Sequence, residues 1–360
     1  MSRCFHVEMT AIESPAIPLV YFFGGATLPS YANSTLRYMR SRWKGDIIVL
    51  HSHYVPRKIR RITYLHYTEW YDSRPFEEFK DGSPLEESFR QGFWYFTAER
   101  FFVLAQWANR ADVQRFLHAE LDVALYDVGD LPETLDSWGN GLFFPRASSE
   151  FAGASLLYVN SLLALSDLLK FAGQNADLGY EMRVLAAFND AHPDKAFALP
   201  SHSSIETDLG IQKTWKGLAP SDIGGIVDVG ALGTWMMGND PRNVRGRASY
   251  NKAIVEGHGS QLFAKLRFRY SPPRRALMVR APESQELEIK ALHIHSKEMR
   301  MALSPWRLAL ATGLLRLPWK SPIVMQSLHS EFFRGARAAV DFFYVRLRRS
   351  GLTPKRNPKD

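Results

Sequence analysis

The chain has 360 residues, of which 46% are hydrophobic and 13% aromatic, enough to bury the core of one large domain with an appendage. Its single cysteine, Cys4, excludes a disulfide framework and a thiolate zinc cage, which fits a reducing compartment. The net charge of +8 lies entirely in residues 301–360, which hold eleven Lys and Arg and three acids, since 11 − 3 = 8. The first 300 residues are balanced, at 34 basic (45 − 11) and 34 acidic (37 − 3) side chains, which argues against a nucleic-acid-binding body.

The sequence shows neither a targeting signal nor a membrane-spanning pattern. No basic segment followed by an apolar core stands at the N-terminus. No window approaches the ~20 apolar residues of a membrane-spanning helix. We therefore expect a cytoplasmic protein.

The first half of the sequence alternates strand and helix patterns. Apolar runs at 17–23, 46–51 and 62–67 are typical of buried strands, and the apolar spacing over 31–43 predicts a helix. A further helix is expected from Thr97, as its cap, to about residue 111. This alternation predicts an α/β fold with a mostly parallel sheet flanked by helices.

Ligands of such sheets bind beyond the carboxyl ends of the strands. Gly24 and Ser30 follow the first expected strand, so we predict that they line the opening of a ligand pocket. The Gly24-Gly25 pair alone is a weak signal, because two glycines after a strand usually make an ordinary turn.

An apolar run at 116–126 contains two carboxylates, Glu120 and Asp122. Read as one strand, the run places both on the same face, because strand side chains alternate with period two. Burying two carboxylates there is costly unless a cation or hydrogen-bond donors compensate them. Taken alone, however, such a pair is more often a helix cap or an ion pair.

A second segment, 292–297, repeats His293, His295 and Lys297 at every other position. Lone histidines are more often structural than metal-binding, but these two segments each supply what the other lacks for a divalent metal site. Because an imidazole would coordinate, Mn²⁺ or Mg²⁺ is favoured over Ca²⁺. A lysine beside the metal suits a phosphate-bearing ligand, which indicates chemistry on a diphosphate.

Several common catalytic patterns are absent from the sequence. It has no Gly-x-Ser-x-Gly elbow, no phosphate-binding P-loop, no Gly-x-Gly-x-x-Gly fingerprint and no His-Glu-x-x-His zinc motif. These absences argue against a serine nucleophile, a P-loop nucleotide enzyme, a dinucleotide-dependent enzyme and a zinc peptidase.

Five stretches resemble, in the same order, those of bacterial nucleotide-sugar glycosyltransferases of the GT-A type, an incompletely characterised group associated with surface polysaccharide synthesis. They span much of the chain: 92–102, Glu120-x-Asp122, 225–233, 238–243 and 292–297. The resemblance implies a GT-A-like catalytic domain over 1–300, with a nucleotide-binding half and an acceptor half. It also implies a nucleotide-sugar donor and a glycan or lipid-linked acceptor.

In such enzymes an acidic motif holds a divalent metal, Mn²⁺ or Mg²⁺, on the donor diphosphate, and a later histidine completes the coordination. Here the resemblance gives these roles to Glu120 and Asp122, with Asp122 as the stronger candidate, and to His293 or His295. Of the two histidines we favour His295, because it lies closer to Lys297.

The remaining site residues follow from the same chemistry. A metal together with Lys297 would stabilise the departing diphosphate, where negative charge develops. Arg100 is a candidate for nucleotide or phosphate contact, and a helix-surface ion pair is the alternative. Asp228 is the first candidate for the base that deprotonates the acceptor, with Glu181 and Asp240 as the others, and an inverting enzyme needs such a base.

Residues 301–360 form a separate basic segment in which arginines alternate with Trp and Phe. Such a pattern predicts an amphipathic helical tail that binds the anionic inner face of the plasma membrane. Packing of the aromatic side chains on the catalytic body is the alternative. For the whole protein, two other functions stay open: a metal-dependent phosphohydrolase, which would need more clustered Asp and His motifs, and a non-enzymatic basic adaptor for anionic lipid.

Overall fold

The computed structural model describes residues 16–53, 55, 58–85, 92–202, 215–237, 266–271, 276–280, 285–294, 299–304 and 307–308. The chain divides into two compact units. The first comprises Met1–Leu121, Gly129–Phe144 and Leu156–Phe197, and the second comprises Asp122–Val128, Pro145–Ser155 and Ala198–Asp360. The chain therefore passes from one unit to the other several times, first between Leu121 and Asp122.

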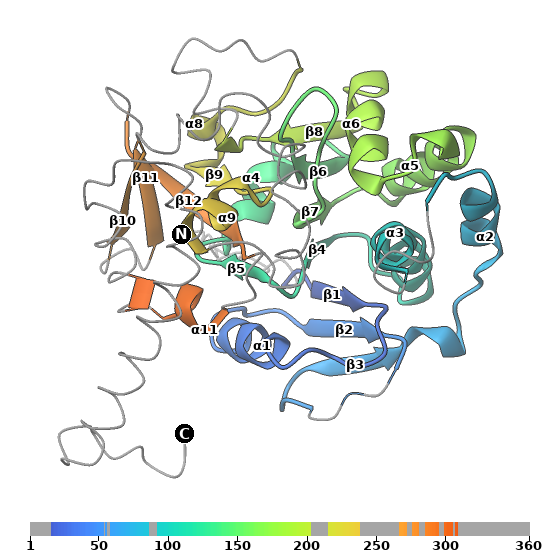
Figure 1. Cartoon of the computed structure of the whole chain (residues 1–360), viewed down its shortest axis with the longest axis horizontal. Helices are drawn as coiled ribbons and strands as arrows, with labels where there is room; N and C mark the ends of the chain where they lie inside the picture. The colour runs from blue at the N-terminus through green and yellow to red at the C-terminus, as the bar shows by residue number, and fades with distance from the viewer. Residues whose placement is uncertain are drawn as a thin grey trace, which may run out of the picture. The chain divides into compact units, whose positions relative to one another are not determined.

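The first unit is built on a seven-stranded sheet with the strand order β3-β2-β1-β4-β7-β6-β8 (Figure 1). Its elements in chain order are β1 (Leu19–Phe23), α1 (Ala32–Arg40), β2 (Ile47–His51), β3 (Thr63–His66), η1 (Tyr67–Glu69), α2 (Arg74–Asp81), α3 (Phe93–Arg110), β4 (Phe116–Ala119), α4 (Leu131–Asp136), β6 (Leu142–Pro145), β7 (Leu156–Val159), α5 (Leu162–Gln174), η3 (Ala176–Leu178), α6 (Glu181–Ala191) and β8 (Ala196–Leu199).

The four strands β3, β2, β1 and β4 are mutually parallel, whereas β7 runs antiparallel to both β4 and β6. The strands alternate along the chain with helices. The predicted α/β fold, with a mostly parallel sheet flanked by helices, is therefore confirmed. The apolar runs at 17–23, 46–51 and 62–67 correspond to β1, β2 and β3, within one or two residues at each end.

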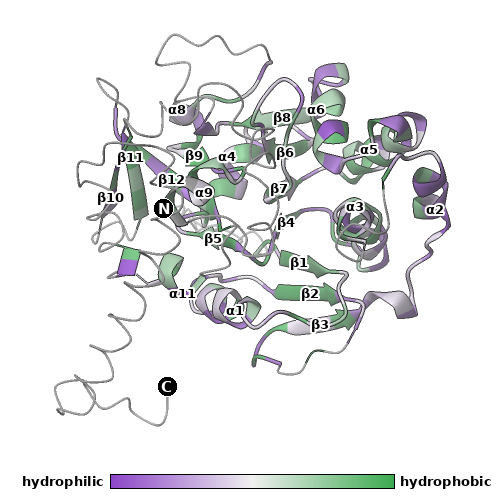
Figure 2. Ribbon diagram, viewed as in Figure 1, coloured by the Kyte–Doolittle hydropathy of each residue, from purple (hydrophilic) through white to green (hydrophobic). Residues whose placement is uncertain are grey.

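Hydropathy explains these elements. Figure 2 shows β1 and β2 green along their length, as expected for parallel strands buried on both faces, whereas α2 is largely purple. Helix α3 is apolar around most of its circumference, and ten of its 18 residues are buried, which is typical of a helix inside a core.

The start of α3 was predicted wrongly. The helix begins at Phe93, after Gly92 in the left-handed region (φ 84°), and not at Thr97. The Thr97 hydroxyl, which has one proton to donate, lies within hydrogen-bonding distance of both the Trp94 carbonyl (2.9 Å) and Glu181 Oε2 (3.0 Å). The additional turn is stabilised by packing, since the Trp94 ring lies 4.7 Å from that of Tyr180.

The run at 116–126 is two strands and not one. β4 ends at Ala119, β5 begins at Val123, and a turn containing Glu120, Leu121 and Asp122 separates them. The two strands join different sheets, β4 that of the first unit and β5 that of the second. The expectation of Glu120 and Asp122 on one face of a single strand is therefore wrong, although both carboxylates lie in the same turn.

The second unit contains a five-stranded sheet in which β10-β11-β12-β5 are antiparallel neighbours and β9 pairs with β12 in parallel. Its elements are β5 (Val123–Leu125), α8 (Pro220–Ile223), β9 (Ile226–Val227), α9 (Ala231–Met237), β10 (Arg267–Ser271), β11 (Ala276–Arg280), β12 (Leu287–His293) and α11 (Met299–Ala302).

Most of the basic tail, together with Asp240, His295 and Lys297, lies outside the described residues; of 301–360, only 301–304 and 307–308 belong to them. Within the described ranges, no helix combines the length and the apolar character needed to cross a membrane. The boundary at residue 300 between body and tail stays a prediction.

One half-buried carboxyl group of the first unit has a distinctive environment. Glu99 lies on α3 and accepts a hydrogen bond of 3.1 Å from the Tyr67 hydroxyl. Burial raises the pKa of Glu99 to about 7, against the opposing effect of that hydrogen bond. The native state therefore binds a proton at Glu99 more tightly than the unfolded chain does.

We predict that Glu99→Gln stabilises the protein at high pH. Because the pKa is raised on folding, Glu99 costs stability progressively as pH rises from about 4.5 to about 7, and the full cost persists above that. The free energy of unfolding should rise by roughly 1–3 kcal/mol at pH 8 and change little near pH 4.5. Denaturant titrations at the two pH values measure the difference. Glu78→Gln, at an exposed site on α2, is the control, and an equal effect of Glu99→Gln at both pH values would contradict the prediction.

Candidate functional site

The turn formed by Glu120, Leu121 and Asp122, called the acidic turn below, follows β4, and the side chains of β4 anchor that strand in the core. The Phe116 ring packs against Trp107 of α3 at 5.4 Å. Since side chains alternate along a strand, His118 points to the same side as Phe116. His118 is buried and donates from Nδ1 to the Val20 carbonyl at 3.0 Å. Burial, assisted by the nearby positive charge of Arg100, lowers the pKa of His118 to about 3, so this histidine is neutral at physiological pH.

Beyond β4, the turn is fixed from within the first unit. The Thr35 hydroxyl donates to the Leu121 carbonyl at 2.6 Å, and Arg100 donates from Nη1 to Glu120 Oε1. The backbone of the turn and the Glu120 carboxylate therefore each have an anchor.

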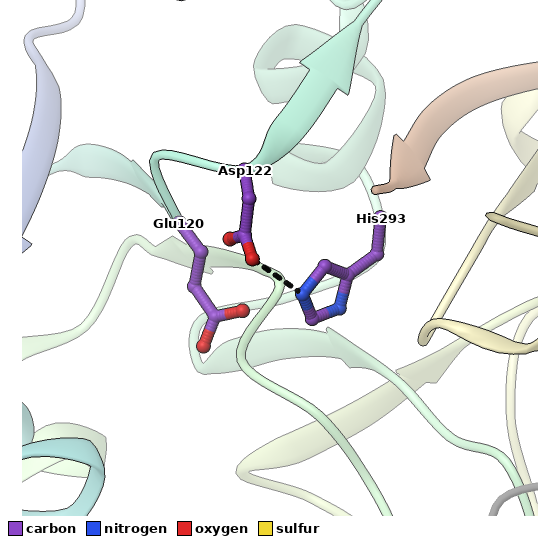
Figure 3. Close-up of side chains that lie close together, drawn as sticks. All are labelled: Glu120, Asp122 and His293. Carbon is purple, nitrogen blue, oxygen red and sulfur yellow. Dashed lines mark ion pairs between the residues drawn. The ribbon is translucent and has the colours of Figure 1, made fainter. Parts of the chain in front are cut away.

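In the second unit, Asp122 lies next to His293. β5 and β12 are antiparallel, with His293 opposite Val123, and the Ile294 N–H donates to the Asp122 carbonyl at 2.8 Å. Asp122 Oδ2 lies 3.4 Å from His293 Nε2 (Figure 3), and the Asp122 residue is only 7% exposed. The sheet thus brings together two residues that are far apart in the sequence.

Glu120, Asp122 and His293 each offer a ligand atom, and these atoms lie within 4.8 Å of one another. Asp122 and His293 belong to the second unit, and Glu120 is joined to Asp122 through Leu121 alone. Two carboxylate oxygens and one imidazole nitrogen are donors that Mn²⁺, Mg²⁺ and related divalent ions accept, so the residues fit the metal expected from the sequence. Among the residues that the structure describes, this is the one group of three or more His, Cys, Asp or Glu side chains so arranged.

His293 is the histidine that the structure describes beside Asp122. The sequence favoured His295, which lies outside the described ranges, so the choice between the two stays a prediction. The same holds for Lys297 as a phosphate contact and for Asp240 as a base.

Arg100 forms an ion pair on each side of its guanidinium group. It is 4% exposed, and it contacts Glu120 through Nη1 and Glu181 Oε1 through Nη2 at 3.1 Å. Thr97 donates to the other oxygen of Glu181 at 3.0 Å. Burial raises the pKa of Glu181, and the charge of Arg100 opposes that shift. Arg100 therefore forms ion pairs, as the alternative expected, but these pairs are buried and do not lie on the helix surface.

Asp228 accepts three backbone hydrogen bonds. Oδ1 receives the Leu232 N–H at 3.0 Å, and Oδ2 receives the N–H groups of Gly233 at 2.8 Å and His293 at 3.2 Å. Asp228 is fully buried, which raises its pKa, while these donors act in the opposite direction. It therefore caps the start of α9 and holds the end of β12. Asp228 lies three residues before α9, and a capping residue is ordinarily recognised directly before the first helical residue, so the sequence pattern does not indicate this role.

Gly24 and Ser30, the predicted pocket residues, have different surroundings. Gly24 is buried after β1, where an added Cβ would lie 2.4 Å from the Phe96 ring and the carbonyl accepts from Ser52. Ser30 is exposed just before α1. The Gly24 position thus has a packing requirement, and a ligand-binding role for either residue stays a prediction.

Gly233 makes the closest backbone approach to the site. An added Cβ would lie 1.8 Å from the His293 carbonyl oxygen and 3.1 Å from Asp228 Oδ2. A methyl group at this position must displace either α9 or the end of β12, and both are held by Asp228.

We predict that Gly233→Ala destabilises the protein by about 1–3 kcal/mol and weakens any divalent-metal binding, because His293 is displaced. Gly173→Ala is the matched control: Gly173 lies in α5 with nothing within 4 Å of an added Cβ, and alanine favours a helix by roughly 1 kcal/mol. Denaturant unfolding and Mn²⁺ titration of both variants provide the test. Similar stabilities of the two variants would contradict the close approach.

Comparison with known proteins finds no matching family model and no matching curated protein. Among solved structures, the chain is similar to apo mouse xyloside xylosyltransferase 1 at 12% identity, over 51% of this chain and 85% of that one, with a TM-score of 0.38. It is similar to the galactosyltransferase LgtC with donor and acceptor sugar analogues at 15% identity, over 53% and 78%, with a TM-score of 0.37. A glycosyltransferase involved in glycosylation of the major capsid of PBCV-1 matches at 11% identity, over 51% and 82%, with a TM-score of 0.29. These values assign the chain to no family.

Proposed function

We propose that the protein is a metal-dependent glycosyltransferase that moves a sugar from a nucleotide-sugar donor to a glycan or lipid-linked glycan. The observation that carries the proposal is the group formed by Glu120, Asp122 and His293. These two acidic residues and this histidine come from separate segments of the sequence that were both expected to supply metal ligands, and their candidate ligand atoms lie within 4.8 Å of one another. The resemblance of the sequence motifs to nucleotide-sugar enzymes supplies the substrate class.

The charges of the site suit a diphosphate only when they are compensated. Glu120 and Asp122 are acidic and would repel a phosphate group by themselves. A bound divalent cation would reverse that charge and stabilise the nucleoside diphosphate as it leaves. The part of the chain's own residues is then to hold the cation: Glu120 and Asp122 supply charge, and His293 supplies a neutral nitrogen.

The backbone of His293 is held in place by neighbouring residues, which suits a metal ligand. Its backbone N–H is bonded to Asp228, and β12 is paired with both β5 and β9. A ligand held on a paired strand keeps its orientation when the substrate changes, which is what a metal site requires. We propose Lys297, four residues further on, as a phosphate contact.

For the acceptor base we keep Asp228 as the first candidate, with Glu181 and Asp240 as the others. The raised pKa of Asp228 suits a group that takes up a proton. Glu181 accepts hydrogen bonds from Arg100 and Thr97, which makes it a weaker candidate than Asp228.

We predict that Asp122→Asn abolishes sugar transfer, by roughly a hundredfold or more, while the fold is kept, because the amide is nearly isosteric but carries no charge. His293→Ala should raise the Mn²⁺ concentration needed for half-maximal activity. Asp127→Asn removes an exposed carboxylate nearby and is the matched control, expected to stay close to wild type.

The substrate is identified first by a thermal-shift panel of nucleoside diphosphates with and without Mn²⁺. Stabilisation by one nucleotide only in the presence of metal supports a transferase, and turnover of the corresponding nucleotide sugars follows. Near-normal activity of Asp122→Asn at saturating Mn²⁺ would remove Asp122 from the metal site. Release of phosphate from a phosphomonoester without sugar transfer would favour the phosphohydrolase.

We further propose that the protein is cytoplasmic and binds the inner face of the plasma membrane through residues 301–360, where a lipid-linked acceptor would lie. We predict that the full chain co-sediments with anionic vesicles at low salt. Replacing Arg346, Arg348 and Arg349 by Gln should weaken binding, since each cation near the surface contributes about 1 kcal/mol. The same number of exposed charges removed from the first unit, by Gln at Arg74, Arg110 and Lys170, is the control. Equal loss in both triple variants would exclude the tail as the anchor.

A further inference from the structure

We propose that Arg100 and Glu181 are positioning residues for the acidic turn: Arg100 holds Glu120 in place, and Glu181 neutralises Arg100 so that the charge of Glu120 remains available to a divalent cation. The inference rests on the metal role of Glu120 proposed above. It assigns Glu181 to the support of the metal site and not to the acceptor.

The geometry places Arg100 between two carboxylates of the first unit. Its Nη1 contacts Glu120 and its Nη2 donates to Glu181 Oε1 at 3.1 Å, so one planar guanidinium group uses two corners for two acids. Arg100 is buried in α3, and Glu181 is the buried first residue of α6. The fork geometry restricts where the Glu120 carboxylate can lie.

Glu181 is itself held from the same helix face as Arg100. Thr97 precedes Arg100 by three residues on α3, so their side chains are neighbours, and its hydroxyl donates to Glu181 Oε2 at 3.0 Å. Each oxygen of Glu181 therefore has a donor from α3. This arrangement fixes Glu181 and, through it, the orientation of the guanidinium group.

The charges explain why a second carboxylate is present. Arg100 and Glu120 alone would form a neutral pair, and the arginine would repel a cation approaching Glu120. With Glu181 the three side chains sum to −1, so a cation near Glu120 experiences a net attraction. Burying Glu181 is unfavourable in itself, because desolvation penalises its charge, so the extra acid is not explained by stability of the ion pair alone.

The test is Mn²⁺ binding to the full chain without nucleotide, followed by the electron paramagnetic resonance signal of free Mn²⁺. Glu181→Gln should raise the Kd about 10- to 100-fold, as for other residues that support a metal ligand. The double variant Arg100→Gln/Glu181→Gln restores the sum of −1 but removes the anchor of Glu120. Its Kd should therefore lie between that of Glu181→Gln and that of the wild type.

Two controls separate electrostatics from packing. Thr97→Val removes a hydrogen bond to Glu181 and no charge, so its Kd should change less than about threefold. Asp136→Asn disrupts another arginine–carboxylate pair of the first unit, Arg115–Asp136 at 2.7 Å, and should lower the Tm without changing the Kd.

The outcomes are distinct. A wild-type chain that binds no Mn²⁺ overturns the metal site, and this inference with it. If the wild type binds Mn²⁺ and Glu181→Gln binds equally well, the metal site stands and the positioning role is overturned. If the double variant binds more weakly than Glu181→Gln, the role of Glu181 is structural and the inference is also overturned. Recovery in the double variant supports it, because a purely structural role would make a second substitution additive.

Discussion

Antiparallel pairing of β5 with β12 is the contact on which the candidate site depends. It sets His293 opposite Val123 and ties the Ile294 N–H to the Asp122 carbonyl, which places the imidazole 3.4 Å from the Asp122 carboxylate. Neither strand forms this arrangement alone, because Asp122 immediately precedes the short strand β5 and His293 is the last residue of β12. The imidazole that the sheet brings beside Asp122 helps to offset the cost of burying this carboxylate.

The sequence predicted those parts of the fold that depend on local patterns. The strands β1, β2 and β3 follow from apolar runs ended by polar or glycine residues, and the first helix from apolar spacing. The division of 116–126 into two strands could not be predicted, because Phe116–Ala119 and Val123–Leu125 are apolar whichever sheet they join. Strand partners are set by contacts far away in the sequence, and a one-dimensional pattern does not contain them.

The candidate site was predictable in its residue types and less so in its connections. Glu120, Asp122 and His293 are recognisable because acidic and imidazole groups interrupt apolar segments. The buried pairs of Arg100 have no such signal: Arg100 and Glu181 are separated by much of the first unit, and each alone resembles an ordinary surface charge on a helix. Only the packing of α3 near the start of α6 reveals that the charges are matched in space.

Asp228 links an element of the fold to a proposed metal ligand through a single carboxylate. A mutational scan scored by activity would therefore mark position 228 as essential whether or not its side chain touches a substrate. Functional maps of this protein need a stability measurement beside each activity, since α9 and His293 lose their support together.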